Sequence, residues 1–282
     1  MTWKTLNTLK GDGRMMKPVL TPYDLGDGVV AFSTTRKGGC SEGLYASMNV
    51  NAFCGDSADA VRANREALAD SLGITPERLI IPHQVHGTEL RQIGPEFFSL
   101  PEDVKRMLLE GIDGVLTAMP GTCVGVSTAD CIPVLLHDPV RHAVAAVHAG
   151  WRGTLQRIVQ KMVAELRAAF LTDPATLEAV IGPGISLARF EVGDEVYAQF
   201  AEAGFDMDRI AQRTDKWHID LPACNRMQLE EAGLASDHIR MSDVCTYDNA
   251  DLYFSARRLG VESGRIYTGI LLNESTSKNE FQ

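Results

Sequence analysis

Four short apolar segments separated by turn residues dominate the middle of the chain. They lie between residues 112 and 149, and Met-Pro-Gly, Ala-Asp-Cys and Asp-Pro turns separate them: IDGVLT, CVGVST, IPVLLHD and HAVAAVHA. Short runs rich in β-branched residues between such turns are typical of strands. We expect these four segments to pack closely and to form the core sheet.

Two further segments have apolar residues three or four positions apart, as in an amphipathic helix. The first covers residues 56–73 and ends at a glycine, which favours a glycine cap. Its predicted inner face carries Val61, Asn64, Leu68 and Leu72. The second follows the four strands directly, and we expect it to lie on the sheet through one apolar stripe: Leu155, Ile158, Val159, Met162, Val163, Leu166 and Phe170.

The rest of the pattern predicts a mixed α/β fold in a single domain. Strands are expected over LEAVIG and over residues 266–272, and helices after Gly193 and over residues 222–232. Because no repeat, low-complexity tract or Pro/Gly/Ser-rich linker divides the chain, we expect one domain over residues 1–272. The remaining residues, 273–282, predict a loose C-terminal tail.

Composition and charge narrow the function classes. Of the 282 residues, 45% are hydrophobic and 23% charged, which is ordinary for a globular protein. A net charge of -10 argues against non-specific binding to nucleic acid or to anionic membranes. The N-terminus lacks a secretory signal pattern, and no apolar run reaches the roughly 18 residues of a membrane-spanning helix. We therefore expect a cytoplasmic protein, and its six cysteines, without a C-x-x-C pair, are expected to be reduced.

Metal-capable side chains concentrate in three short segments: HQVHG (83–87), STADCIP (127–133) and VHAGWRG (147–153). Each alone has an ordinary structural explanation, since a histidine at a strand end is often held by a hydrogen bond and a cysteine in an apolar run is often core. However, Cys131 lies in a predicted turn and His148 at the end of the following strand, so antiparallel pairing would bring both to one sheet edge. Gly150 and Gly153 flank Arg152, where free backbone N–H groups and a guanidinium suit an anion.

The chain resembles the bacterial laccase-domain family, whose members are also called multicopper polyphenol oxidoreductases or peptidoglycan editing factors. The motifs that carry the resemblance, together with Arg257, Arg258, Gly264 and Arg265, cover nearly the whole chain: STTRKGGCSEGLYASMNV, GDSADAVRANREAL, QVHGTEL, DGVLT, STADCIPVLLHD, AVHAGWRGT, IGPGISLARFEVGDEV and HIDLPACNRMQLEEAG. The resemblance implies a layered α-β-β-α fold. It also implies a zinc-dependent purine nucleoside phosphorylase with adenosine deaminase activity, acting on adenosine, inosine and methylthioadenosine together with phosphate.

The resemblance also implies the metal ligands. They are the histidine of QVHG, the cysteine of TADC and the histidine of HAGWRG, which here are His86, Cys131 and His148. Three such ligands leave a fourth position on zinc for water or substrate, as in a catalytic site. Zinc lowers the pKa of bound water to about 7, which suits attack on the purine C6 in deamination. An N/S ligand set can also accept copper.

Phosphorolysis needs phosphate beside the ribose C1′, and planar arginine side chains match phosphate well. The candidates are Arg152, which we also count with Cys131 as catalytic, and Arg36 of TTRKGG, for which the alternative is a solvated arginine in a turn. Asn49 is a candidate for hydrogen bonding to sugar or base, and its alternative is a turn cap.

Three features remain open from the sequence. Asp130 either orients a histidine ligand or closes the turn. His83 is either a structural or surface residue or acts beside the metal. The stretch between Leu90 and Asp113 is longer than the family pattern, which predicts an added surface helix or lid.

Two rival functions belong to other classes. One is copper-dependent oxidation of phenols, although a single His2Cys site does not match the several copper ions of a multicopper oxidase. The other is a cysteine hydrolase that trims cell-wall precursors, with Cys131 as nucleophile and His148 as base. A non-enzymatic partner in wall synthesis is a third alternative.

Overall fold

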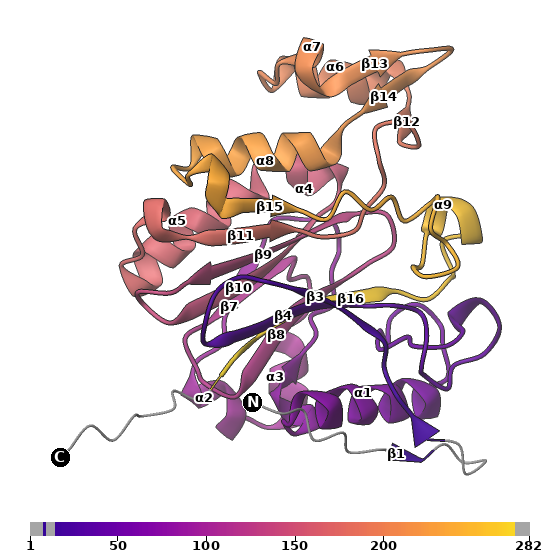
Figure 1. Cartoon of the computed structure of the whole chain (residues 1–282), viewed down its shortest axis with the longest axis vertical. Coiled ribbons are helices and arrows are strands. Elements are labelled where there is room, and N and C mark those ends of the chain that lie inside the picture. The colour runs from indigo at the N-terminus through magenta and orange to yellow at the C-terminus, as the bar shows by residue number, and fades with distance from the viewer. Residues whose placement is uncertain (1–7, 10–14, 274–282) are drawn as a thin grey trace.

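Two β-sheets packed face to face form the centre of the molecule (Figure 1). The computed structural model describes residues 8–9 and 15–273, so the expected tail lies outside the described residues except for Asn273. The six-stranded sheet has the order β15 (Ile239–Met241), β11 (Glu178–Ile181), β9 (Ile132–Asp138), β10 (Ala143–Ala149), β7 (Gly114–Thr117), β6 (Leu90–Gln92). The five-stranded sheet has the order β3 (Leu20–Tyr23), β4 (Val29–Thr34), β16 (Ile266–Leu272), β8 (Thr122–Thr128), β5 (Leu79–Ile80).

The central strands are buried on both faces. In β10, Val147 packs toward the helices while Val144 and Ala146 face the other sheet. The space between the sheets is filled by side chains from both of them, including Val124 of β8 and Ile270 of β16. Because both faces of these strands are buried, their sequences are continuous apolar runs and do not alternate between apolar and polar residues.

Helices cover the two outer faces of the sheets (Figure 1). On the six-stranded sheet lie α5 (Ile158–Phe170) and α8 (Leu221–Glu231). On the five-stranded sheet lies α1 (Ala58–Leu72), through Leu68 and Leu72. The mixed α/β fold and its α-β-β-α layering are therefore confirmed.

Both predicted amphipathic helices are present, with one difference. The first is α1, and Gly73 caps it in the left-handed conformation with φ 69°. The second is split into α4 (Trp151–Leu155) and α5, because Arg157 between them has φ 64° and interrupts the helix. The split leaves α4 as a short separate turn directly after β10.

The expected core sheet of four strands is wrong in one respect. Three of the four strands, β7, β9 and β10, lie in the six-stranded sheet, but β8 lies in the other one, beside β16 and β5. The turn at residues 129–131 therefore carries the chain from one sheet to the other instead of closing a hairpin. Four successive apolar strands do not reveal which sheet each strand joins. A strand is equally buried whether its neighbour in sequence pairs with it in one sheet or faces it across the interface between two sheets.

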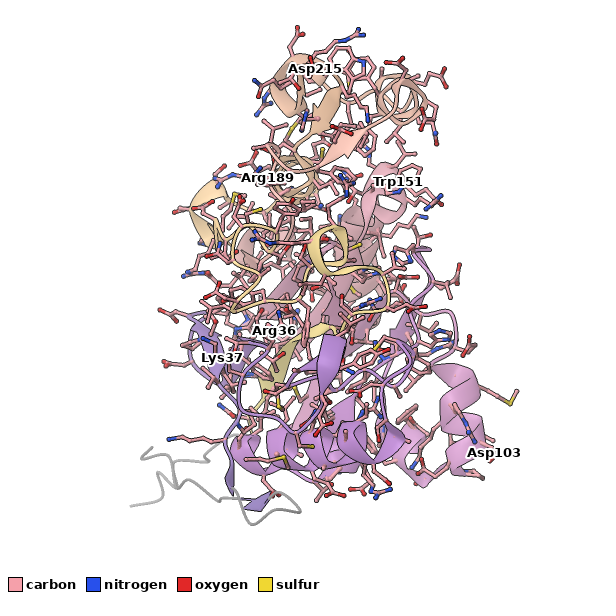
Figure 2. The ribbon with its side chains drawn as sticks, turned by 90° about the vertical axis from the view of Figure 1, so that its right-hand side faces the viewer. Arg36, Lys37, Asp103, Trp151, Arg189 and Asp215 are labelled. Carbon is pink, nitrogen blue, oxygen red and sulfur yellow. The ribbon has the colours of Figure 1, made fainter. Side chains whose placement is uncertain are left out.

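The remaining elements lie around this core. A three-stranded sheet in the order β12 (Glu191–Val192), β14 (Trp217–Ile219), β13 (Ala211–Arg213) forms, with α6 (Asp194–Glu202) and α7 (Met207–Ile210), one end of the molecule, where Figure 2 shows Asp215. The long stretch after Leu90 contains α2 (Pro95–Ser99) and α3 (Glu102–Leu108), as its length predicted. Two short strands, β1 (Thr8–Leu9) and β2 (Met15–Met16), and the short helix α9 (Ala256–Leu259) are the remaining strands and α-helix of the described residues. Among the described residues, no helix combines the length and apolar character needed to cross a membrane.

The packing between the sheets generates a stability prediction. Leu135 of β9 is fully buried between them. Replacing it in Leu135→Ala leaves a cavity, and we expect the free energy of unfolding to fall by about 2–5 kcal/mol. Urea denaturation measures the change, with Met107→Ala as control because that side chain is 74% exposed. Equal losses in the two variants would contradict the assignment of this core.

Candidate metal centre

Three side chains from separate elements meet at one edge of the paired sheets. The ligating atoms of His86, Cys131 and His148 all lie within 4.8 Å of one another, a grouping that could hold a metal ion. His148 is near the end of β10, and its register partner on β9 is Pro133, two residues after Cys131. The antiparallel pairing that the sequence predicted therefore brings these two residues together. His86 arrives from the loop between β5 and β6.

A buried carboxylate, that of Asp113, organises two of these three residues. The Nδ1–H of His148 donates to Asp113 Oδ1 at 2.7 Å, and both side chains are almost fully buried. Because this bond occupies Nδ1, the Nε2 of His148 is the nitrogen left for a metal. Burial raises the pKa of Asp113, but the hydrogen bond and charge of His148, with the N–H groups of Gly87 and Val85, outweigh burial and lower it.

The same carboxylate shapes the loop that carries His86. The backbone N–H groups of Val85, His86 and Gly87 donate to it at 3.3, 3.0 and 2.7 Å. His86 has φ 63°, in the left-handed region that non-glycine residues seldom adopt. Three successive N–H groups that converge on one anion compensate for this conformation. Asp113 thus fixes the position of both histidines.

The role of Asp113 is not evident from the sequence, although this residue opens the DGVLT motif. Asp130, the carboxylate expected from the sequence either to orient a histidine ligand or to close the turn, accepts hydrogen bonds from Thr246 Oγ1 and from the N–H of Arg257, both at 2.6 Å. Asp130 has φ 87°. It therefore closes the turn before Cys131 and ties that turn to the C-terminal part of the chain.

The environment favours the thiolate form of Cys131. Burial raises the pKa of this thiol, but the charges and hydrogen bonds of His148 and His86 outweigh burial and lower it to about 6. Burial lowers the pKa of His148, whereas the Cys131 thiolate and Asp113 raise it to about 9. Thiolate is the form of cysteine that binds metals.

Gly150 leaves room for an ion between these ligands. A Cβ at this position would lie 3.1 Å from both Cys131 Sγ and His86 Cδ2. A larger residue would require Cys131 or His86 to shift by a few tenths of an ångström. Two imidazoles, one thiolate and this open space fit a zinc-type ion with three protein ligands.

Two hydrogen bonds of Gln84 and the stacked ring of His83 hold the loop on which His86 lies. The Gln84 amide donates to Ser127 O at 2.8 Å and accepts from Ser127 N at 2.7 Å, which fixes the loop to the end of β8. His83 bonds Glu110 at 2.7 Å and stacks on Phe53 with ring centroids 4.1 Å apart. His83 is not part of the metal-capable group, but it lies in the wall of the cavity next to it.

A cavity of about 330 Å³ opens over the three candidate ligands. We call it the metal cavity. Its polar wall includes Gln84, Ser127, Thr128 and Arg265. This volume lies in the range of small-molecule sites.

The three candidate substrate-binding residues lie outside the wall of the metal cavity. The Arg36 guanidinium donates to Ala46 O at 2.9 Å and to Ala250 O at 2.6 Å, so backbone carbonyls hold it. Arg152 lies in α4 with its guanidinium 4.3 Å from the ring centre of Trp151, and no hydrogen bond or ion pair holds it among the described residues. Their roles toward phosphate stay predictions.

Asn49 reaches the cavity only through neighbouring residues of its wall. It is fully buried, its Nδ2 donates to Asp56 at 2.9 Å, and its Oδ1 accepts from the N–H of Arg265 at 3.1 Å. Asn49 therefore supports the backbone of Arg265, which lines the metal cavity. Arg265 was noted in the sequence as one of a cluster of family motif residues but was not singled out.

The role of Asp113 can be tested by an isosteric change. In Asp113→Asn the amide cannot accept from His148 and from three N–H groups at full strength, so we expect zinc affinity to fall about 10–100-fold. Competition with a chromophoric chelator measures the affinity. Asp103→Asn, on exposed α3, is the control and should bind zinc as the parent does. Unchanged affinity in Asp113→Asn would remove Asp113 from the centre.

The lowered pKa of Cys131 predicts a pH profile for metal-free protein. Thiolate forms as pH rises through the thiol pKa, so alkylation of Cys131 should increase with a midpoint about pH 6 rather than 9. His148→Ala removes the main favourable charge and should move the midpoint up. Mass spectrometry of the Cys131 peptide after short exposure to iodoacetamide gives the rate at each pH. A midpoint near 9 in the parent protein would disprove the thiolate assignment.

Comparisons with known proteins identify the family of this chain. A family model described as multi-copper polyphenol oxidoreductase laccase matches residues 30–273. A purine nucleoside phosphorylase of Bacteroides thetaiotaomicron is 46% identical over 246 residues, which cover 86% of this chain and 91% of that protein. A protein named adenosine deaminase RL5, from an unknown prokaryotic organism, is 41% identical over 248 residues, which cover 86% of this chain and 94% of that protein.

Solved structures give the same result. The crystal structure of YlmD from Geobacillus stearothermophilus superposes with a TM-score of 0.81 at 31% identity, covering 88% of this chain and 93% of that one. The resemblance drawn from the sequence motifs is confirmed. The chain belongs to the multi-copper polyphenol oxidoreductase laccase family.

Proposed function

We propose that this chain is a zinc-dependent purine nucleoside phosphorylase that also deaminates adenosine. The observation that carries the proposal is the group of His86, Cys131 and His148 beneath a cavity large enough for a small molecule. Relatives named purine nucleoside phosphorylase and adenosine deaminase support the reaction class. Adenosine, inosine and methylthioadenosine are the proposed nucleosides, with phosphate as the second substrate.

Each protein group has a defined task in this proposal. His86, Cys131 and His148 hold the zinc, which when bound supplies Lewis acidity and lowers the pKa of water. Asp113 keeps the proton of His148 on Nδ1 and so keeps Nε2 directed at the ligand position. The walls of the metal cavity confine the nucleoside beside the centre.

The anion is the second requirement of phosphorolysis. Phosphate approaching the ribose C1′ needs cationic partners, and Arg265 in the cavity wall joins Arg152 and Arg36 as a candidate. The Arg265 guanidinium donates to backbone carbonyls, among them Val261 O at 2.7 Å, and these bonds hold it in place. A guanidinium held in this way loses little entropy on binding phosphate.

A cysteine hydrolase is the second candidate function, favoured by the acidic thiol of Cys131 beside His148. The two proposals differ in what zinc does. Zinc should protect Cys131 from alkylation and raise activity if Cys131 is a ligand, whereas it should inhibit an enzyme that uses Cys131 as nucleophile.

Copper-dependent phenol oxidation is favoured by the family description but not by the ligand count. Within the described residues, metal-capable side chains come together in one group of three. This supports chemistry at a single ion rather than at several.

The proposed reaction is tested by product identity. We expect zinc-loaded protein with adenosine and phosphate to form adenine, and adenosine without phosphate to form inosine, as separated by liquid chromatography. His86→Ala, Cys131→Ala and His148→Ala should each lower both rates by roughly 100-fold or more, because Lewis-acid stabilisation is worth several kcal/mol.

The matched control is His142→Asn, since His142 is exposed and has φ 52°, a conformation that asparagine tolerates. It should keep full activity. Absence of both products from zinc-loaded parent protein would reject the proposal, and dye oxidation by copper-loaded protein would point to the rival redox function.

A further inference from the structure

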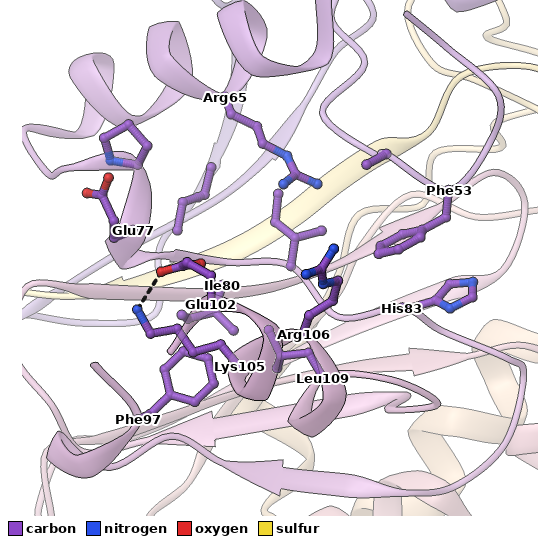
Figure 3. A pocket seen from close by; sticks show the side chains of 14 residues that line it. Phe53, Arg65, Glu77, Ile80, His83, Phe97, Glu102, Lys105, Arg106 and Leu109 are labelled. Carbon is purple, nitrogen blue, oxygen red and sulfur yellow. Dashed lines mark hydrogen bonds and ion pairs between the residues drawn. The ribbon is translucent and has the colours of Figure 1, made fainter. Parts of the chain in front are cut away.

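A second and larger cavity lies next to the metal cavity. It measures about 590 Å³, is open to solvent on one side, and lies between α1, β5 and the two helices α2 and α3 (Figure 3). We call it the arginine cavity. Its apolar wall includes Ile80, Phe97 and Leu109, and three cationic side chains, Arg65, Lys105 and Arg106, line it as well. The proposed reaction at the metal centre assigns it no role.

Two guanidinium groups face this cavity from opposite walls. Figure 3 shows Arg65 reaching in from α1 and Arg106 from α3. Arg65 Nε donates to Val50 O at 2.7 Å, but its Nη2 is buried and has no hydrogen-bond partner. Because Nη2 has almost no accessible surface, a ligand in the cavity could accept from it only after a small shift of the guanidinium. No hydrogen bond or ion pair holds the Arg106 guanidinium among the described residues.

The carboxylates in the wall do not neutralise these arginines. Glu102 pairs with Lys105 at 2.7 Å. Glu77 is hydrogen-bonded to Thr75. In Figure 3 Glu102 lies against Lys105 and Glu77 lies at the same end of the cavity, whereas Arg65 and Arg106 lie nearer to Phe53. The charges are therefore separated along the cavity, and the end beside Phe53 is cationic.

That cationic end adjoins the metal cavity. Phe53 and His83 belong to the walls of both cavities, and their stacked rings form part of the partition. His83 is in turn held by Glu110, which follows α3. The segment that supplies Arg106 therefore also fixes one side of the metal cavity.

We propose that the arginine cavity is a second ligand site, which holds a phosphoryl group between Arg65 and Arg106. Two planar guanidinium groups match the oxygens of a phosphoryl dianion in two-pronged fashion. The volume is in the range of small-molecule sites, and the apolar wall suits an organic part. The ligand is either inorganic phosphate or a small phosphate monoester. This site rests on the residues of the arginine cavity alone and does not depend on the reaction at the metal centre.

Calorimetric titration of zinc-loaded protein tests the proposal, with inorganic phosphate, AMP and adenosine as probes. Arg106→Gln removes one guanidinium from an exposed position of α3, so the substitution leaves the hydrophobic core unchanged. We expect it to weaken binding of the phosphoryl probe about tenfold, the usual effect of losing a charged hydrogen bond, and to leave adenosine binding unchanged. Arg106→Lys keeps the charge and should recover part of the loss.

The control is Arg62→Gln on the same helix as Arg65. Its side chain is 68% exposed and pairs with Asp59 instead of facing the cavity, so probe binding should match the parent. An effect of Arg106→Gln on inorganic phosphate identifies free phosphate as the ligand. An effect on AMP alone identifies a monoester.

The proposal is overturned if Arg106→Gln binds phosphate and AMP as the parent does. Its failure is distinguishable from failure of the phosphorylase proposal. If the parent protein forms no adenine but binds a phosphoryl probe, and Arg106→Gln weakens that binding, the second ligand site stands and the phosphorylase proposal is rejected. If the parent protein carries out phosphorolysis and Arg106→Gln binds the probe as the parent does, the phosphorylase proposal stands and the second ligand site is rejected.

Discussion

The candidate metal centre depends on the burial of one carboxylate. Asp113 is fully buried, and the hydrogen bonds from His148 and from backbone N–H groups hold its pKa below the usual value. The same four hydrogen bonds orient one ligand and stabilise the left-handed conformation of His86. The buried carboxylate of Asp113 thus fixes two ligands that lie 62 positions apart in sequence, His86 and His148.

The location of the centre follows from the way in which the two sheets are connected. The turn that carries Cys131 is where the chain leaves one sheet at the end of β8 and enters the other at the start of β9. Asp130 fixes this crossing by hydrogen bonds to Thr246 and Arg257. Cysteine and histidine are therefore presented by rigid strand ends, which hold ligand geometry more accurately than free loops do. Gly150, at the end of β10, completes the arrangement by leaving space.

Two cavities with different chemistry share one partition. The metal cavity offers two imidazoles and a thiolate, and the arginine cavity offers guanidinium groups and an apolar wall. The stacked pair of Phe53 and His83 separates them, and the stretch that contains α2 and α3 supports that pair. A ligand in the arginine cavity would contact the same rings that bound the metal cavity. This stretch therefore shapes the surroundings of the centre without supplying a ligand.

Local sequence determined the elements and the ligand types, because strand burial, helix periodicity and caps depend on near neighbours. The strands from β7 to β10, the helix that ends at Gly73 and the meeting of Cys131 with His148 were all predicted in this way. Motif resemblance added His86, the layered fold and the family.

Only the tertiary structure placed β8 in the second sheet, gave Asp113 its role and engaged Arg36 with backbone carbonyls. It also set Arg106 opposite Arg65. These features depend on which distant groups share a buried space, and a buried charge takes whichever partner the packing brings to it. The spacing of residues along a chain does not encode that choice.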